Sequence, residues 1–152
     1  MSISIQNEDF DICVELSALR SASNNVGAIV SFVGLVRDLS YDENIQNIHV
    51  EHYPGMSEKA LNKIILEAKS RWELLAIRVI HRVGTLTPND QIVMVAVAST
   101  HRGNAFSSCE FIIDYLKTDA PFWKKEVKTQ GGEWVVTKES DIERMQRWMQ
   151  KS

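Results

Sequence analysis

The sequence contains only two cysteines, Cys13 and Cys109, and they form no Cys-x-x-Cys pair. They are far apart in the chain, and each lies among apolar residues. We therefore predict two buried free thiols, which are compatible with a reducing compartment. Cys109 falls on the apolar side of a predicted helix and not in an electropositive opening, so the chain lacks a candidate thiolate nucleophile.

Long hydrophobic segments are also absent. The longest apolar run, Gly27 to Val36, covers about ten residues and is interrupted by Ser31, which is too short for a membrane-spanning helix. The first five residues, MSISI, lack the charged and then apolar pattern of a signal peptide. These absences predict a cytoplasmic protein that does not associate with membranes.

The chain has no excess of positive charge, because its formal net charge is −3. Nucleic-acid binding without sequence preference needs many phosphate-neutralising cations, so this balance argues against it. The seven glycines form no phosphate-binding loop of the P-loop or dinucleotide type. On a strand His49 and Glu51 share one face and His52 points the other way, so this pair has no third ligand at a useful spacing, and we expect neither a metal site nor a cofactor.

The residues that are present predict one domain over residues 1–152 with an α+β fold. Apolar residues make up 44% of the chain and charged residues 24%, which is ordinary for a soluble globular protein. Apolar periodicity predicts the elements. Strands are expected at Ile3–Ile5, Gly27–Val36, Ile45–Tyr53, Leu74–Val83 and Gln91–Ser99, with a strand pair at Phe122–Thr137 around Gly131-Gly132. Helices are expected at Phe10–Arg20, Ser57–Trp72, Arg102–Asp119 and Glu139–Met149, and a mobile loop at 38–44.

Three local features refine these elements. Gly34 inside a buried strand predicts a bulge or a close backbone approach. Ser57 is a candidate cap of the helix that follows it. Phe106, Cys109 and Ile113, together with Leu116, predict the buried stripe of the Arg102–Asp119 helix.

Cationic side chains mark both ends of that helix. His101 and Arg102 lie at its start, where free N–H groups and a partial positive charge favour anions. Lys117 lies near its end, and Lys124 follows after Pro121. If their side chains converge, they form a pocket for a small anionic ligand, and a lysine beside other cations acquires a lowered pKa that suits proton transfer.

Each of these residues also has a simpler interpretation that the spacing leaves open. Arg102 could pair with a surface carboxylate, Lys117 with the helix dipole, and Lys124 could be a solvated charge. Arg37 ends a buried strand before a polar loop, where ligand contacts are common, but a plain surface arginine is equally compatible with that position.

Several segments occur in an order that points to one family. They are Ser31–Arg37, Glu51–Met56, Ile80–Gly84, Ser99–Arg102, Phe111–Lys117, Ala120–Glu126 and Trp134. In this order and at these separations, the chain resembles the large, catalytic subunit of molybdopterin synthase over residues 26 to 141. The resemblance implies an α/β hammerhead-type fold with an added small β-rich subdomain.

The resemblance also implies a reaction in molybdenum cofactor biosynthesis. The family converts cyclic pyranopterin monophosphate (precursor Z) into molybdopterin by installing two dithiolene sulfurs. The sulfur comes from the C-terminal Gly-Gly thiocarboxylate of a small ubiquitin-like carrier subunit, so the nucleophile belongs to the partner. The implied assembly is a heterotetramer, in which a dimer of this subunit holds one carrier at each end.

Position by position, the resemblance assigns roles to the cationic residues. Lys117 is implied as the main acid–base or covalent-contact residue, and Lys124 as the second catalytic lysine. Arg37, His101 and Arg102 are implied to hold the phosphate and pterin of the substrate, where fixed cations stabilise developing negative charge. The segments Leu35–Arg37 and Lys124–Glu126 match substrate contacts, which adds Leu35, Val36, Lys125 and Glu126 to the expected site.

The chain departs from the family pattern at two positions. Leu35 replaces a lysine found in many relatives. Lys138 stands where an arginine can reach a neighbouring subunit's pocket, and a lysine there lacks bidentate geometry.

A non-catalytic adaptor that docks the ubiquitin-like carrier is the alternative function. A nucleotide or RNA-phosphate module is disfavoured by the net acidity and by the lack of interleaved aromatics.

Overall fold

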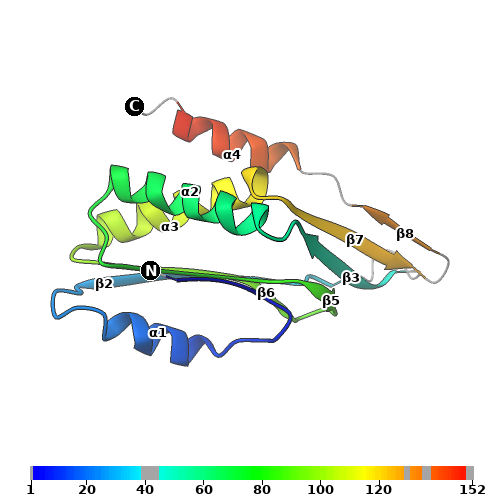
Figure 1. Ribbon diagram of the computed structural model, residues 1–152, viewed down its shortest axis with the longest axis horizontal. Coiled ribbons are helices and arrows are strands. Elements are labelled where there is room, and N and C mark those ends of the chain that lie inside the picture. The colour runs from blue at the N-terminus through cyan, green and yellow to red at the C-terminus, as the bar shows by residue number, and fades with distance from the viewer. Residues whose placement is uncertain (1, 39–44, 129–130, 135–137, 150–152) are drawn as a thin grey trace.

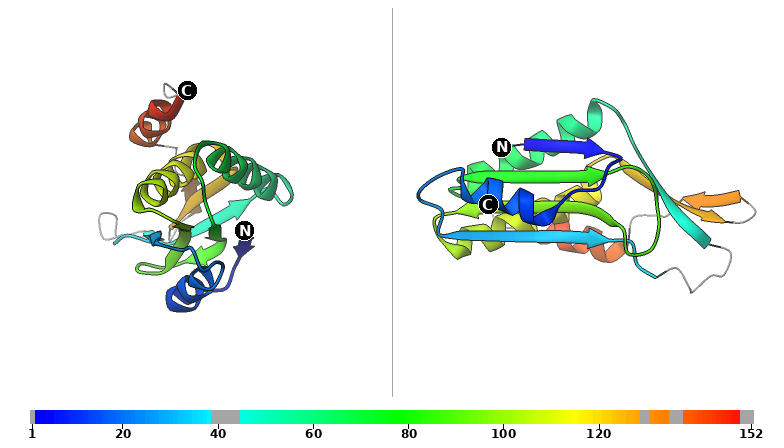
Figure 2. Two further views of the ribbon diagram at one scale, coloured as in Figure 1. Left: turned by 90° about the vertical axis from the view of Figure 1, so that its left-hand side faces the viewer. Right: turned by 90° about the horizontal axis from the view of Figure 1, so that it is seen from below.

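Helices cover both faces of one sheet, and a second sheet extends from its end (Figure 1). The computed structural model describes residues 2–38, 45–128, 131–134 and 138–149. One helix lies against one face of the first sheet, two lie against the other, and a further helix packs outside those two, as the end-on view shows (Figure 2). The mixed order of helices and strands confirms the predicted α+β class.

The first sheet has the strand order β1-β4-β6-β2. Strand β1 is parallel to β4, and the other neighbours are antiparallel. The second sheet has the order β5-β3-β7-β8, and all its neighbours are antiparallel. The strands are β1 (Ser2–Gln6), β2 (Ala28–Leu35), β3 (Ile45–His52), β4 (Ala76–Arg82), β5 (Gly84–Leu86), β6 (Gln91–Ser99), β7 (Phe122–Lys128) and β8 (Gly131–Trp134). The helices are α1 (Ile12–Arg20), α2 (Met56–Arg71), α3 (Arg102–Asp119) and α4 (Glu139–Met149).

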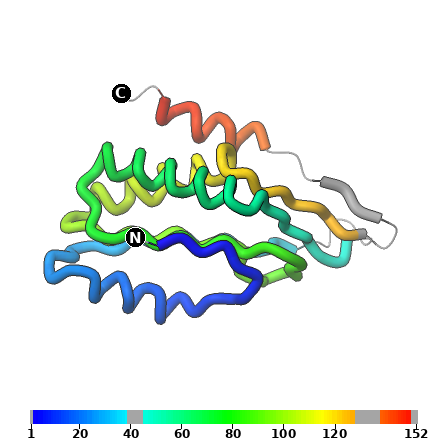
Figure 3. Tube along the Cα trace, viewed as in Figure 1, coloured from blue at the N-terminus to red at the C-terminus, as the bar shows by residue number. Residues whose placement is uncertain are grey.

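Strand β6 is apolar along its length because both of its faces are covered. Val93, Val95 and Val97 belong to the core under α2 and α3, whereas Met94 and Ala96 belong to the core under α1. A strand buried on both faces shows a continuous apolar run instead of alternation. The path of the chain in Figure 3 shows α1 on the opposite side of this sheet from α2 and α3.

The expected irregularity at Gly34 is confirmed. The pairing of β2 with β6 shifts register between Gly34 and Leu35. A Cβ atom on Gly34 would lie only 2.7 Å from Cγ1 of Val93, so the close approach requires a glycine. The bulge bends the end of β2, and Arg37 follows directly after it.

The start of α2 differs from the prediction. The helix begins at Met56, with Gly55 as its N-cap at φ 85°, a conformation that favours glycine. The N–H of Gly55 donates to Glu58 Oε2 at 2.6 Å. Ser57 is therefore not the cap. Its buried hydroxyl accepts from the N–H of Tyr53 at 3.0 Å and donates to the carbonyl of Pro121 at 2.8 Å.

Three other expectations need correction. Cys109 is buried as predicted, but Cys13 is exposed, because Ile12 turns toward the sheet and the next residue is rotated about 100° away from it. Phe106 is 61% exposed, because α3 there lies beside the edge strand β2 and no described element covers it. Gly131 and Gly132 begin β8 instead of forming its turn.

Some expectations lie outside the described residues, namely the predicted loop at 39–44 and the strand end at 135–137. Within the ranges that the structure describes, no helix combines the length and the apolar character needed to cross a membrane.

Candidate active site

Two lysines meet where α3 leads into β7. The residue before Pro121 cannot easily stay helical, so α3 ends at Asp119 and β7 begins at Phe122. Strand β7 then pairs with β3, with Lys124 opposite Val50. Directly opposed residues share one face of a sheet, and Val50 is only 1% exposed. The stem of Lys124 therefore points toward the interior.

The electrostatics around the Lys124 amine reveal which charges surround it. Burial above all, and then the positive charges of Lys117, Lys138 and Arg37, together lower its pKa to about 8 against the opposing charge of Asp141. These residues come from the end of α3, the approach to α4, the end of β2 and α4 itself. The fold thus brings together Lys117, Lys124, Arg37 and Lys138. We call this group the cationic corner.

The end of β2 shows how Arg37 is placed. The N–H of Val36 donates to the carbonyl of Asp90 at 2.8 Å, and its carbonyl accepts from the N–H of Asn89 at 2.8 Å. Val36 is only 3% exposed, so its side chain belongs to the core. A contact of Val36 with substrate therefore stays a prediction, and it would not involve an exposed side chain. The neighbouring Arg37 is exposed, and Leu35 is 47% exposed.

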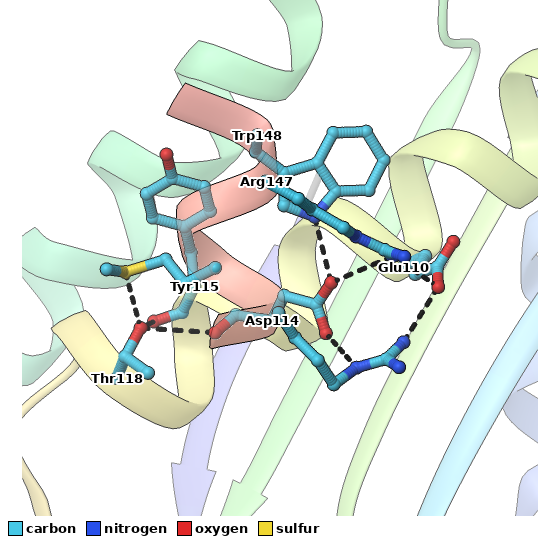
Figure 4. Close-up of polar contacts among 8 residues, drawn as sticks. Glu110, Asp114, Tyr115, Thr118, Arg147 and Trp148 are labelled. Carbon is cyan, nitrogen blue, oxygen red and sulfur yellow. Dashed lines mark hydrogen bonds and ion pairs between the residues drawn. The ribbon is translucent and has the colours of Figure 1, made fainter. Parts of the chain in front are cut away.

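Helix α4 is fastened to α3 by a buried carboxylate. Asp114 of α3 is 5% exposed and accepts from the indole Nε1–H of Trp148 at 2.8 Å. It also accepts from Arg144 Nε at 3.1 Å and from Arg147 Nη2 at 3.3 Å. Figure 4 shows this carboxylate facing Arg147 and Trp148, with Glu110 beside them. A buried charge needs such partners because leaving it unpaired is costly.

Packing and a second carboxylate complete this attachment. Trp148 meets Trp72 and Phe111 edge to face, with ring centroids 5.8 Å and 5.6 Å apart. Glu110 forms ion pairs with Arg144, at 2.7 Å, and with Arg147, and these guanidinium groups lower its pKa. Because α4 is held here, Lys138 just before the helix and Asp141 in its first turn lie close enough to influence Lys124.

The structure does not bring His101 and Arg102 into the cationic corner of the same chain. His101 is the N-cap of α3 and Arg102 its first residue, and both are exposed. Fifteen residues of helix separate Arg102 from Lys117, which corresponds to about 22 Å at 1.5 Å per residue. The expected convergence of all four side chains is therefore wrong within one chain, because α3 is a continuous helix.

The remaining expected site residues lie along β7. Successive residues of a strand face opposite sides, so Lys125, which is opposite His49, lies on the other face of the sheet from Lys124. Glu126 shares the face of Lys124 but lies two residues farther along the strand, opposite Ile48. Only Lys124 of this segment belongs to the cationic corner.

A pocket of about 540 Å³ adjoins Lys117. It lies between the edge strand β2, helix α3 and the first turns of α4. Its lining includes Val30, Phe32, Phe106, Ile113, Lys117 and Asp141. Cys109 also lines it, but burial raises the pKa of this thiol to about 12, so it does not supply a thiolate at neutral pH. Among the residues that can be described, no three His, Cys, Asp or Glu side chains cluster as metal ligands.

Sequence reasoning missed two residues at this corner, His81 and Asp141. His81, near the end of β4, is 4% exposed. Burial, together with the charges of Lys124 and Lys117, lowers the pKa of its imidazole to about 4 against the opposing hydrogen bond to the Arg82 carbonyl. The sequence signal was a histidine at the end of an apolar strand, the same signal that singled out His101. Asp141 gave no such signal, because an acidic residue in the first turn of a helix is common.

This arrangement suits chemistry on an anionic substrate. A partly dehydrated amine with a pKa near neutrality exchanges protons readily. The neighbouring cations stabilise negative charge that develops on a bound ligand. The corner contains no thiolate of its own, so any sulfur nucleophile has to arrive with a ligand or partner.

Comparisons with known proteins agree with this interpretation. The sequence profile of the family described as MoaE protein matches residues 5–119. The chain is 52% identical to the molybdopterin synthase catalytic subunit of Ralstonia nicotianae, over 97% of this chain and 84% of that protein. The molybdopterin biosynthesis MoaE protein from Burkholderia ambifaria superposes with a TM-score of 0.85 at 51% identity, covering 97% of each chain.

A more distant structure shares the fold. It is the complex of subunits 1 and 2 of molybdopterin-converting factor from Helicobacter pylori, matched with a TM-score of 0.72 at 24% identity over 90% of each chain.

Proposed function

The chain belongs to the MoaE protein family, and on this premise we propose how its cationic corner takes part in catalysis. Family membership makes it the catalytic type of subunit in molybdopterin synthesis, an enzyme of molybdenum cofactor biosynthesis that transfers sulfur. The α/β hammerhead-type fold with a second, smaller sheet is the one that this family implies.

The proposed substrates are precursor Z and the thiocarboxylated C-terminus of a small ubiquitin-like carrier. Each thiocarboxylate sulfur attacks a side-chain carbon of precursor Z, and a carbon–oxygen bond breaks at that carbon. For one sulfur the departing oxygen stays on the phosphate as the cyclic phosphate opens, and for the other it leaves as water. Water then hydrolyses each acyl–sulfur bond, which leaves the sulfur on the pterin and a carboxylate on the carrier. Two carriers are consumed for each dithiolene. The buried thiol of Cys109 and the position of Cys13 on α1, across the first sheet from α3, support an external sulfur source.

The single observation that supports this mechanism best is the environment of Lys124. Lys124 is half-buried, and this burial, together with the charges of Lys117, Lys138 and Arg37, lowers the pKa of its amine to about 8. A substantial neutral fraction at physiological pH lets Lys124 accept a proton. Lys117, exposed at the mouth of the corner, is placed to contact the carrier's anionic tail as the main acid–base or covalent-contact residue.

His101 and Arg102 enter this site from a second copy of the chain. In a two-fold dimer with α3 helices side by side and antiparallel, the start of one α3 lies beside the end of the other, so Arg102 of one copy faces Lys117 of its partner. The edge position of β2 and the exposed Phe106 support pairing along this side. Lys138, which influences Lys124 of its own chain, then lies near the same joint pocket.

Reconstitution tests the proposed function against the adaptor alternative. Purified protein is mixed with precursor Z and thiocarboxylated carrier, and dithiolene is measured as its fluorescent oxidation product. The buffer mimics the cytoplasm, which is the proposed location of the reaction. We expect product at two carriers consumed per molecule. Binding of the carrier without any product would instead support the adaptor. The net charge of −3 argues against an RNA-binding function.

A further inference from the structure

His81 occupies an unusual position for a histidine. It is the next-to-last residue of β4 and is 4% exposed. Its Nδ1 lies 2.8 Å from the backbone carbonyl oxygen of Arg82. A carbonyl oxygen only accepts hydrogen bonds, so Nδ1 bears the hydrogen and Nε2 keeps its lone pair in the neutral ring. This hydrogen bond fixes the plane of the imidazole.

The fixed ring lies flat against Phe122, the first residue of β7. The two ring centroids are 3.8 Å apart and the planes differ by only 9°. His52, opposite Phe122 in the sheet register, is also stacked, at 6.3 Å and 24°. The carbonyl of Pro121, one residue earlier, accepts the hydroxyl of Ser57 at 2.8 Å. The start of β7 is therefore held on its inner side by three side chains.

Phe122 and Lys124 are two residues apart on one strand, so they share a face of the sheet. Any rotation or slip of Phe122 moves the stem of Lys124 with it. The distance from the stack to the amine is short enough that the charges of Lys124 and Lys117 act on His81. A positively charged side chain at position 81 would repel the amines of Lys117 and Lys124, whereas a neutral aromatic ring supports the strand without such repulsion.

From this geometry we propose that His81 is a positioning residue for the sulfur-transfer reaction. It clamps Phe122 by ring stacking and so holds the Lys124 amine in the cationic corner. The inference rests on the proposed function for its link to catalysis, but not for its structural content. Charged and titratable groups from several elements face His81 and Lys124. Lys117, Lys124 and His52 face His81, and Lys117, Lys138, Asp141 and Arg37 face Lys124.

Two substitutions separate the ring from the hydrogen bond. His81→Phe keeps a planar neutral ring and loses the donor, whereas His81→Asn keeps a donor near the Nδ1 position and loses the ring. His49→Phe is the matched control, because His49 lies on β3 in the second sheet, on the opposite face from Phe122 and Lys124, with its Nδ1 3.1 Å from the hydroxyl of Thr85. All variants are tested in the full-length chain, with circular dichroism as the check of folding.

The first readout does not require activity. The lysines are reductively methylated with ¹³C-formaldehyde, and the Lys124 signal, assigned with Lys124→Arg, is titrated by NMR. We expect Lys124 to titrate near 8 in the wild type, His81→Phe and His49→Phe. In His81→Asn, hydration of the released amine moves its midpoint up by about one unit or more. An unmoved midpoint in folded His81→Asn would overturn the proposal.

The second readout is steady-state kinetics in the reconstituted reaction. We expect His81→Asn to lower kcat by about tenfold or more with little change in KM for precursor Z, and His81→Phe to restore most of kcat. Equal losses in both variants would contradict a role for ring stacking. If wild-type protein forms no product but the Lys124 midpoint still depends on the ring, the proposed function fails and the positioning role stands.

A second variant keeps the test decisive if His81→Asn does not fold. Phe122→Leu retains an apolar side chain but removes the aromatic partner. It should produce the same upward movement of the Lys124 midpoint, and a midpoint that stays near 8 in folded Phe122→Leu would also overturn the proposal.

Discussion

At the scale of single residues, the environment of Lys124 gives its amine a different pKa from that of a surface lysine. Burial and three neighbouring cations lower its pKa to about 8, against one opposing carboxylate, Asp141. Since the neutral amine accepts the proton in our account, the fraction of competent enzyme increases as pH rises through 8. Below pH 7 most of the amine is protonated, so turnover should fall by about tenfold per pH unit.

This dependence gives a prediction for Lys124→Arg. Arginine keeps the positive charge but cannot deprotonate in this range. We expect kcat to drop about 100-fold or more, with the limb near pH 8 lost from the pH–rate profile. Lys63→Arg, an exposed substitution on α2, serves as the control and should keep both rate and profile. Retention of the limb in Lys124→Arg would show that another group titrates there.

Some residues of the candidate site could be predicted from the sequence and others could not. Lys117, Lys124 and Arg37 were identified because element ends and a proline turn are visible in the sequence. His81 was overlooked, and the burial of the Val36 side chain was not foreseen, because burial of a residue after a bulge depends on pairing with distant segments such as Asp90. The exposure of Cys13 likewise depends on which side of α1 meets the sheet.

At the scale of elements, α4 depends on its attachment to α3. Asp114→Asn removes the carboxylate that accepts from Arg144, Arg147 and Trp148. Because both arginines are about half exposed and regain water, we expect a loss of only about 1–3 kcal/mol in unfolding free energy. Denaturant titration measures this loss.

Release of α4 should also appear as faster tryptic cleavage at Arg144 and Arg147 in Asp114→Asn. Glu110→Gln is the matched control, since Glu110 is 43% exposed and its ion pairs are worth less than about 1 kcal/mol. If Asp114→Asn resists trypsin as well as the wild type, the carboxylate does not hold α4.

Most elements were predictable because their apolar periodicities are long. The helices at α1, α3 and α4 and the strands of the first sheet lie close to their expected bounds. The start of α2 was missed because its cap is a glycine at positive φ, a conformation set by the turn and not by a side-chain pattern. The attachment of α4 was not predictable, since Asp114 and Arg147 are 33 residues apart.

At the scale of the whole molecule, the net charge of −3 coexists with a local concentration of cations. The helix that separates Arg102 from Lys117 divides the expected site between its two ends. The sequence analysis did not predict this division, because it did not compare the length of the helix with the reach of the side chains at its two ends. Under the proposed function, a complete site therefore requires two copies of the chain.

Subunit mixing tests this requirement. Lys117→Ala and Arg102→Ala chains are each expected to be nearly inactive. After exchange at equal concentrations, half of the dimers are mixed, and each mixed dimer has one intact site. Activity should therefore recover to about a quarter of the wild-type value. No recovery, despite mixed dimers detected by mass spectrometry, would place both residues in the same chain's site, whereas an Arg102→Ala chain that is active by itself would separate Arg102 from catalysis.

The most direct measurement of the central claim is a single-turnover reconstitution with Lys117→Ala. Thiocarboxylated carrier and precursor Z are supplied in excess of this variant, of the wild type and of Lys63→Ala as a control. Binding of both ligands is measured in parallel. The account predicts that Lys117→Ala binds carrier and precursor close to wild-type levels and forms almost no dithiolene, while Lys63→Ala behaves as the wild type. Dithiolene formation at the wild-type rate by Lys117→Ala would contradict it.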